Sequence, residues 1–379
     1  MSRLQELIQR LCPEGVEYIP VGELCTVSRG RVMSKDYIKE NAGPYPVYSS
    51  QTENNGELGH IATYDYEGEY VTWTTDGANA GSVFYRNEKF SITNVCGLLT
   101  AKNSTINTRF LYFALSTRAK SYVNSGMGNP KLMSNVMAKI KVPVPPLEVQ
   151  QEIVQILDQF TQLTAELTAE LTARKKQFTF YKTTLFQQAL KATVKYLDEI
   201  SENCDNLRKP VTSGNRTKGD YPYYGASGIV DYVDSYIFDG DYLLVSEDGA
   251  NLLARSTPIA FSITGKNWVN NHAHVLRFEE YATRRYVEFY LNAMDLSPYV
   301  TGGAQPKLNQ KNLNRIPISL PPLPEQRRIV AILDRFDALC NDLTSGLPAE
   351  IAARQKQYEY YRDKLLAFKE RAYFSSSKK

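Results

Sequence analysis

Apolar residues alternate between two patterns along this chain of 379 residues. In two long stretches they recur every three or four positions, which is the spacing of one face of an α-helix. Between these stretches, short aromatic and β-branched runs are broken by Gly, Asn and Asp, which is typical of strands joined by turns. The pattern predicts an α+β protein in which small mixed domains alternate with long helices.

The strand-like runs fall into two regions, roughly 1–146 and 191–322. One helix is predicted inside each region, near 109–123 and near 284–293. Each region is therefore expected to form a mixed domain rather than a pure β-sandwich. The clearest strands are predicted at 70–73, 82–85, 242–245 and 274–276.

The long helices are predicted at 147–190 and within 323–379, each directly after a Pro-Pro-Leu sequence that ends the preceding strand. Their apolar stripes are of heptad type, and we expect them to pair as an antiparallel coiled coil. The second stripe has an additional four-residue step that contains Gly346 and Pro348. A proline inside a helix removes a hydrogen bond, so a kink or break is expected there. The stripe residues predicted to form this helical spacer and to bind partners are Ile153, Leu157, Phe160, Leu167, Leu171, Ile329, Leu333, Phe336 and Leu343.

The two halves of the chain are a tandem duplication. The series that begins at Pro145 and includes Gln150, Ile153 and Leu157 returns from Pro321 with the same residue types, at a constant offset of 176 residues. A repeated series of this length in one register indicates a common structural unit. The duplication predicts four segments, which are a mixed domain at 1–146, a helix at 147–190, a mixed domain at 191–322 and a helical segment at 323–379.

Composition narrows the possible functions only slightly. Lys and Arg number 44 against 41 Asp and Glu, a net charge of +3, which neither requires nor excludes a polyanionic partner. The chain has 26 Tyr and 15 Phe but only 3 His, which suits recognition surfaces better than acid–base catalysis. Its five cysteines are far apart without a CxxC pair, so we expect buried thiols rather than a disulfide framework or zinc site. The first residues lack the apolar run of a signal peptide, and a cytoplasmic location is expected.

The helix that follows each mixed domain carries a specific motif. Both copies begin PPLxxQxxIVxILD, at 145–158 and at 321–334. With two mixed domains and two such helices, nearly the whole chain resembles the specificity subunit of type I restriction-modification enzymes. The entry of each mixed domain, at 16–19 and 194–197, is similar to the entry of the family's domains. The tandem Thr-Ala-Glu-Leu units at 164–171 resemble tetrapeptide repeats found in one subgroup of that family.

The resemblance implies a function without catalysis by this chain. Each mixed domain would be a target-recognition domain for one half of a split DNA sequence, and the antiparallel coiled coil would dock two modification subunits. Restriction subunits would join through them, and S-adenosylmethionine, ATP and magnesium would belong to these partners. Independently, a helix of about 40 residues is roughly 60 Å long, enough to address separated half-sites. Because the loops of the two halves differ, the target is expected to be asymmetric.

Two other functions stay open at this point. The chain would be a self-contained DNA methyltransferase or nuclease if it carried the corresponding motifs. However, it lacks a cofactor-binding glycine loop, an Asn/Asp-Pro-Pro-aromatic loop and a GxxxxGK[ST] phosphate loop. His60, His272 and His274 are too few and too separated for a metal or triad site, and structural or surface roles are expected for them. Alternatively, the chain would be a coiled-coil scaffold that binds no nucleic acid.

Two pairs of loops carry the candidate DNA contacts. Residues 74–79 and 246–251 follow predicted strands and contain matching Asp-Gly-Ala-Asn sequences, which are either simple turns or amides that suit adenine in the major groove. Residues 126–131 and 302–307 place an amide before Pro-Lys, which combines a base contact with a phosphate contact or merely leads into the last strand. The loop residues predicted to bind DNA are Thr75, Asn79, Asn129, Lys131, Ser246, Asn251, Gln305 and Lys307.

Basic residues before the first strong strand of each copy complete the prediction. As DNA contacts they would neutralise phosphates and raise affinity for any sequence, and otherwise they form a solvated charged face. The residues predicted to have this role are Arg29 and Arg31 in the first copy and Arg216 and Lys218 in the second.

Overall fold

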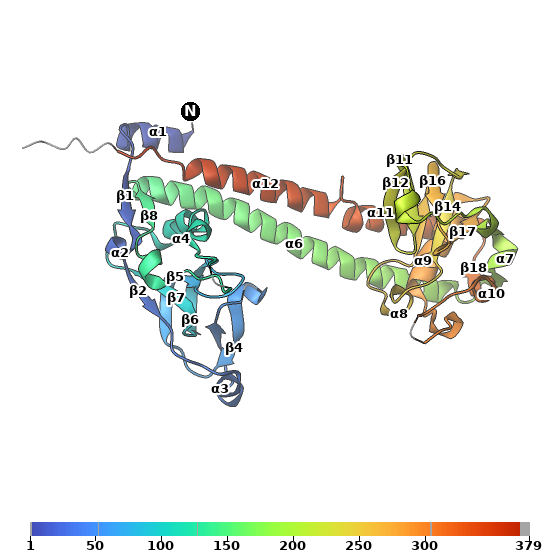
Figure 1. Ribbon diagram of the computed structural model, residues 1–379, viewed down its shortest axis with the longest axis horizontal. Coiled ribbons are helices and arrows are strands. Elements are labelled where there is room, and N and C mark those ends of the chain that lie inside the picture. Colours follow the sequence, from blue (N-terminus) through green and yellow to red (C-terminus); the bar gives the residue numbers. More distant parts are fainter. Residues whose placement is uncertain (1, 52, 127, 304, 372–379) are drawn as a thin grey trace, which may run out of the picture. The chain divides into compact units, whose positions relative to one another are not determined.

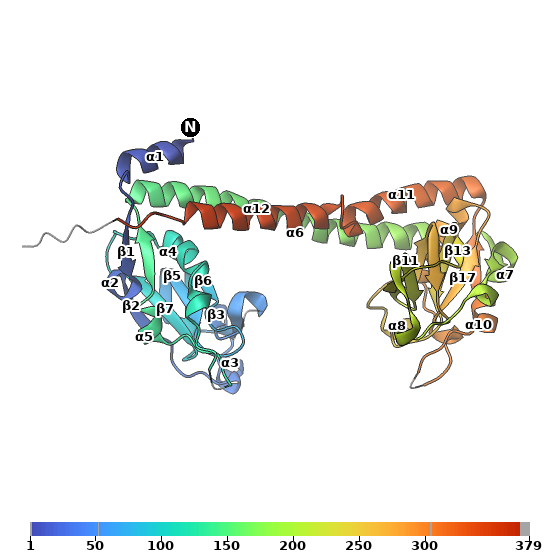
Figure 2. The same ribbon diagram turned by 45° about the horizontal axis from the view of Figure 1, so that its top comes forward.

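The computed structural model describes residues 2–51, 53–126, 128–303 and 305–371 (Figures 1 and 2). Residues 372–379 of the predicted second helical segment, and one residue in each predicted loop at 126–131 and 302–307, lie outside the described residues. The chain forms two compact units. Unit 1 comprises Met1–Glu166 and Ile351–Lys379, and unit 2 comprises Leu167–Glu350.

Unit 1 is built on a six-stranded sheet in the order β2-β7-β5-β6-β3-β4, in which β3 and β6 run parallel and the other pairs of described strands run antiparallel. Helix α4 packs on β5 and β6, and the two-stranded ribbon of β1 and β8 contacts α2 and α4. The strands are β1 (Glu17–Pro20), β2 (Cys25–Arg29), β3 (Tyr45–Tyr48), β4 (Glu57–Ile61), β5 (Tyr66–Thr74), β6 (Val83–Ile92), β7 (Cys96–Ala101) and β8 (Lys141–Val144). The helices are α1 (Arg3–Leu11), α2 (Val21–Leu24), α3 (Lys35–Glu40), η1 (Glu53–Gly56), α4 (Thr108–Ser116), η2 (Ala119–Tyr122) and α5 (Ser134–Met137).

Unit 2 has two four-stranded sheets, in the orders β10-β17-β14-β15 and β12-β11-β16-β13. Helix α9 packs on β14 and β15. The strands are β9 (Thr193–Tyr196), β10 (Glu202–Asn203), β11 (Lys218–Gly225), β12 (Gly228–Val233), β13 (Phe238–Asp239), β14 (Tyr242–Ser246), β15 (Ala260–Ile263), β16 (Lys266–Val269), β17 (Ala273–Arg277) and β18 (Pro317–Leu320). The helices are α7 (Leu197–Ile200), η3 (Asp205–Leu207), η4 (Ser213–Asn215), α8 (Asn251–Ala254), α9 (Tyr281–Ala293), η5 (Ser297–Tyr299) and α10 (Gln310–Asn314).

The topology confirms the duplication that the sequence predicts. Ribbon β1–β8 pairs Glu17 with Val144, and ribbon β9–β18 pairs Thr193 with Leu320, so both partners keep the 176-residue offset. The parallel pair β3–β6 of unit 1 also has a counterpart in the parallel pair β11–β16 of unit 2. The two mixed domains therefore share one strand framework.

Three long helices follow the mixed domains: α6 (Leu147–Ala189), α11 (Leu323–Asn341) and α12 (Leu347–Leu365). In unit 2, Phe178 of α6 stacks on Phe336 of α11 with ring centroids 5.9 Å apart. In unit 1, Phe160 of α6 stacks on Tyr361 of α12 with ring centroids 5.5 Å apart. The core of unit 1 places Ile153 and Leu157 with Leu365. The earlier residue of α6, Phe160, thus contacts the later helix α12, and the later residue, Phe178, contacts the earlier helix α11. The helices therefore pair in antiparallel directions, as predicted.

The residues of the apolar stripe fall into two groups that differ in burial. Ile153, Leu157, Ile329 and Leu333 are completely or almost completely buried in the cores of the units, beside the domain residues. In contrast, Leu167 and Leu171 are only partly buried. The beginning of each helix thus anchors a mixed domain, and the remaining stripe is left for helix pairing.

The break predicted near Gly346 and Pro348 is confirmed, because α11 ends at Asn341 and α12 begins at Leu347. Asp342 Oδ1 accepts hydrogen bonds from the backbone N–H (2.7 Å) and hydroxyl (2.6 Å) of Thr344, which closes the turn. A Cβ on Gly346 would lie 2.5 Å from the carbonyl oxygen of Ala338, so the turn requires glycine. Leu343 corrects the predicted stripe, because it lies in this turn and is 79% exposed.

The first and last described segments of the chain join in unit 1. The N–H of Val16 donates to the carbonyl of Lys369 (2.8 Å), and the N–H of Arg371 donates to the carbonyl of Val16 (2.9 Å). Helix α1 covers this region and forms ion pairs with α6, where Arg3 meets Glu152 at 3.2 Å. All five cysteines are free and buried, as predicted, and no described helix is long and apolar enough to cross a membrane.

Candidate nucleic-acid interface

The two predicted loops of unit 1 lie side by side. The N–H of Gly77 donates to the carbonyl of Pro130 (3.0 Å), and the N–H of Leu132 donates to the carbonyl of Thr75 (2.9 Å). Lys131 additionally pairs through its backbone with Asn124. Strand β5 ends immediately before the first loop, so the sheet positions both loops as one surface.

The centre of this surface is charged. The carboxylate of Asp76 lies 3.7 Å from Lys131 Nζ and 3.6 Å from an Nη atom of Arg29. The Lys131 side chain is 50% exposed, so its ammonium group stays available to solvent or to a phosphate. Asn79 and Asn129 are also exposed, which leaves two amides beside the lysine.

Unit 2 repeats this arrangement with the same backbone contacts. The N–H of Gly249 donates to the carbonyl of Pro306 (3.1 Å), and Leu308 donates to Glu247 (2.7 Å). Gly302 has φ +83°, and a Cβ there would lie 2.5 Å from the carbonyl oxygen of Gln305, so glycine shapes the second loop. Gln305 is exposed and the Lys307 side chain is 53% exposed.

Beneath the unit 2 loops lies a buried ion network. Glu247 accepts from Arg208 at 2.7 Å and pairs with Lys307 Nζ at 3.2 Å. Asp205 lies 2.6 Å from His274 Nδ1, and His274 Nε2 lies 2.7 Å from the carbonyl of Leu308. Burial alone would raise the pKa of Asp205, but hydrogen bonds from His274 and the Val275 N–H, with the Arg208 charge, outweigh it and lower that pKa.

Asp205, Glu247 and His274 have the residue types of a metal site and their ligand atoms are close together. The positions that a cation would take beside these carboxylates are served by Arg208 and Lys307, which neutralise both. We therefore describe the cluster as an ion network that supports the loops. Sequence reasoning missed it because its members lie far apart in the chain.

Several predicted DNA contacts have internal partners in this conformation. Thr75 is fully buried and its hydroxyl donates to the Val95 carbonyl (2.9 Å), and Ser246 is 1% exposed and donates to the Ala226 carbonyl (2.5 Å). The Asn251 amide is held inside its own loop, where Nδ2 donates to the Thr257 carbonyl (3.0 Å). These three side chains position the loops rather than extend from them.

The predicted basic contacts also differ among themselves. Arg31 pairs with Asp65 at 3.0 Å, and Arg216 pairs with Asp231 at 3.1 Å while its guanidinium lies over the Tyr223 ring. Lys218 at the start of β11 is exposed. The two arginines are thus partly neutralised, and Lys218 is more accessible than Arg216 among the predicted phosphate contacts of unit 2.

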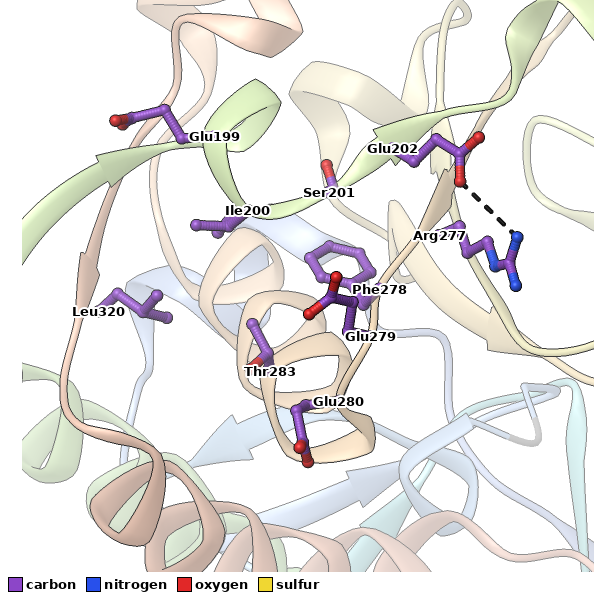
Figure 3. Close-up of a pocket in the computed structure, with 10 residues that line it drawn as sticks. All are labelled: Glu199, Ile200, Ser201, Glu202, Arg277, Phe278, Glu279, Glu280, Thr283 and Leu320. Atoms are coloured by element: carbon purple, nitrogen blue, oxygen red, sulfur yellow. Dashed lines mark ion pairs between the residues drawn. The ribbon is translucent and has the colours of Figure 1, made fainter.

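A pocket of unit 2 has a mainly acidic lining, unlike the lysine-containing loops (Figure 3). It has a volume of about 710 Å³ and is lined by four glutamates, of which Glu202 pairs with Arg277 at 3.8 Å and Glu280 with Arg327 at 3.3 Å. An acidic lining repels phosphate, so this pocket is not included in the candidate interface.

Comparisons with known proteins agree with this architecture. A family model described as the type I restriction modification DNA specificity domain matches residues 13–174 and again 191–353. A putative type I specificity subunit of Mycoplasma pneumoniae is 33% identical over 355 residues, which cover 91% of this chain and 96% of that protein.

Two solved structures share the fold. The crystal structure of the S subunit of a type I restriction-modification system from M. genitalium has a TM-score of 0.64 at 16% identity, over 93% of this chain and 96% of that one. A chain from a structural study of complex assembly and conformational transition of the type I system has a TM-score of 0.57 at 17% identity, over 94% and 98%.

The duplicated mixed domains and their helices define a two-domain DNA-specificity protein. Since the family model matches both halves, the chain belongs to the type I restriction-modification DNA specificity family. It is a DNA-recognition specificity subunit, as the sequence resemblance indicates.

Proposed function

We propose that this subunit binds double-stranded DNA at a bipartite, asymmetric target, with one half-site for each mixed domain. The observation that carries the proposal is the paired-loop surface that occurs once in each unit. In each case a lysine lies in a loop pair that exposes at least one amide at the end of a central strand. Lysine suits a phosphate, whereas an amide suits the paired donor and acceptor of adenine.

The asymmetry follows from the side chains that the two surfaces expose. Unit 1 presents Asn79 and Asn129, but unit 2 presents Gln305 and holds Asn251 inside its loop. The backbone framework is shared, and the accessible groups are not. Two such surfaces would recognise two different base sequences.

The helices support a second part of the proposal, which is recruitment of two copies of one partner. Residues 171–185 of α6 and 351–365 of α12 correspond at an offset of 180 residues, and their patterns of exposure are nearly identical. Residue types at several exposed positions are retained in both copies, although burial does not require them. These pairs are Ala173 and Ala353, Lys176 and Lys356, Phe180 and Tyr360, and Tyr181 and Tyr361.

Three of the four retained exposed positions share one side of each helix. At about 100° per residue, Ala173, Lys176 and Phe180 lie within an arc of about 60°. The exposed positions that differ between the copies lie on a separate arc roughly 90° away. They are Thr172 and Ala352, Lys175 and Gln355, Thr179 and Glu359, and Thr183 and Asp363.

A lysine next to an exposed aromatic ring suits a partner surface with carboxylates around an apolar hollow. Phe180 is 64% exposed and Tyr360 is 61% exposed, so each unit offers one such surface. Two similar surfaces fit two copies of the same protein, which we take to be the modification subunit. Restriction subunits would join through it, and S-adenosylmethionine, ATP and magnesium would be bound by these partners. The chain itself would be non-catalytic and would act in the cytoplasm.

Charge reversal tests the recruitment. Lys176→Glu should reduce the number of bound modification subunits from two to one, measured by sedimentation of the mixed proteins, because a glutamate would repel the acidic partner surface. Lys356→Glu should do the same, and the double variant should bind none. Lys175→Glu is the matched control, since it lies on the arc that differs between the copies. Equal effects of Lys175→Glu and Lys176→Glu would contradict the proposed surface.

The DNA part is tested by mapping methylated bases in cells that hold the modification subunit with and without this chain. We expect methylation at two dissimilar half-sites separated by a fixed spacer, only when the chain is present. Methyl transfer by the purified chain alone would show instead that it is an enzyme.

A further inference from the structure

The turn between β16 and β17 adds a third loop to the candidate interface of unit 2. The N–H of Glu247 donates to the carbonyl of His272 (2.9 Å), which ties the turn to the loop after β14. The N–H of His272 donates to Asn270 Oδ1 (2.8 Å), and Asn270 is itself 7% exposed. The backbone at His272 is therefore held from two sides.

The imidazole of His272 points away from this anchor and has one partner. Its Nδ1 lies 2.8 Å from Asp248 Oδ2, and its side chain is 51% exposed. Among the described residues, Nε2 has no hydrogen-bond partner. Asp248 is bridged to Lys307 through the backbone, and Lys307 follows the exposed Gln305 by two positions. The loop that carries His272 is thus joined, through Asp248, to the loop that carries Lys307 and Gln305.

Unit 1 has a different residue at the same backbone position. There the N–H of Thr75 donates to the carbonyl of Val95 (3.2 Å), the counterpart of the bond between Glu247 and His272. Val95 is partly buried and offers no polar side-chain atom. Asp76, which corresponds to Asp248, is neutralised by Lys131 and Arg29 instead of a histidine.

We propose that His272 recognises a base in the half-site of unit 2 and that Asp248 is its positioning residue. An ionised carboxylate only accepts hydrogen bonds, so in the neutral imidazole it holds the proton on Nδ1 and leaves Nε2 as an acceptor. In the major groove, an acceptor pairs with an exocyclic amino group, which is N6 of adenine or N4 of cytosine. Guanine and thymine present acceptors at these positions and are disfavoured.

This assignment rests on the proposed function and extends it to a residue that sequence reasoning gave a structural or surface role. The lone carboxylate also has a use in this arrangement. A free aspartate facing DNA would repel phosphate. When the aspartate binds and orients a base-reading imidazole, the N–H dipole of that ring partly offsets its negative charge. In unit 1, Val95 at the same position can make only an apolar contact, such as one with a thymine methyl group. The two half-sites would then differ at the corresponding base pair.

The test uses the full chain with its modification subunits and measures competition among DNA targets in which each base pair of both half-sites is varied. His272→Phe keeps a flat ring and removes both nitrogens. It should reduce discrimination by about tenfold at one base pair of the unit 2 half-site. Discrimination in the other half-site should stay unchanged and serves as an internal control. His60→Phe is the matched control, because His60 is 45% exposed and pairs with Glu57 outside the candidate interface.

Asp248→Asn provides the second variant. An asparagine accepts from or donates to Nδ1, so the ring proton is no longer held there and guanine should become tolerated at that same base pair. If both variants keep the wild-type preference at every base pair, the assignment to His272 is wrong. Weakened binding without a change at any single base pair would also overturn it, since that is the effect of a structural or phosphate-binding residue. A wild-type complex that prefers no sequence would instead refute the proposed function.

Discussion

Lys131 and Lys307 are expected to contribute to DNA binding in a different way from the amides beside them. Both lysine side chains are about half exposed, although each ammonium group also faces a carboxylate. Lys131→Ala or Lys307→Ala should weaken binding to all sequences and lower the salt dependence by about one phosphate. The measurement is the affinity for target and random DNA at several salt concentrations.

Asn129→Ala or Gln305→Ala should instead relax discrimination at one base pair, by about 1–3 kcal/mol, and leave the salt dependence unchanged. Competition with single-base variants of the target measures this effect. Identical results for the lysine and amide variants would mean that the loops act only as a backbone scaffold.

The ion network of unit 2 predicts a pH dependence of stability. The pKa of Asp205 is lowered in the folded protein from its usual value of 3.8. Its stabilising contribution is therefore present above that value and is lost as the pH falls through the acid range. Asp205→Asn should cost about 3 kcal/mol at neutral pH, because Arg208 and His274 lose a buried partner. Thermal unfolding from pH 7 to pH 3 should show a smaller acid-induced loss in the variant than in the wild type.

The positions of the loops could be predicted from the sequence, but the roles of their individual side chains could not. Asn79 and Asn251 occupy matching sequence positions, yet one is exposed and the other is bound within its loop. The difference arises because 251–254 form a short helix whose following segment folds back onto Asn251. Tertiary contacts of that kind leave no periodic pattern in the sequence.

Among the helices, the turn at 342–346 has the sharpest structural requirement. Gly346 lies against the Ala338 carbonyl, so Gly346→Ala would force the turn open or shift the end of α11. We expect a loss of about 1–3 kcal/mol in the free energy of unfolding, measured by denaturant titration. Leu343→Ala, at a position of the same turn that is 79% exposed, is the control and should cost less than the glycine substitution. An unaltered stability of Gly346→Ala would show that the two helices adapt freely.

The helical repeat was the most predictable part of the structure, and its interruption shows why. Proline and glycine disturb a helix wherever they occur, so the break could be placed from the sequence. The exposure of Leu343 could not be predicted, because the heptad spacing of apolar residues continues through the turn, whereas the helix is interrupted there. Likewise, periodicity identified Ile153 and Leu157 as apolar-face residues without showing that a mixed domain, rather than a helix or partner, buries them.

For the molecule as a whole, the duplication predicts that recognition is modular. Replacing 1–146 with the corresponding domain of the M. pneumoniae relative should change one half-site and leave the other unchanged. The exchange is feasible because Val16 joins the later segment through backbone atoms, which tolerate different side chains. Methylation mapping of the hybrid decides the matter, and simultaneous change of both half-sites would contradict independent domains.

The pairing of Val16 with Lys369 and Arg371 also bears on how the protein is made. Unit 2 is one continuous stretch of chain, whereas the core of unit 1 includes Leu366, which the ribosome delivers some 200 residues after the first mixed domain has emerged. The segment translated first is thus the one whose packing is completed last. A nascent chain would hold an unfinished apolar surface throughout the synthesis of unit 2, and any product that stopped short of α12 would keep that surface exposed. Only chains that have been synthesised as far as Leu366 can therefore bury the core of unit 1.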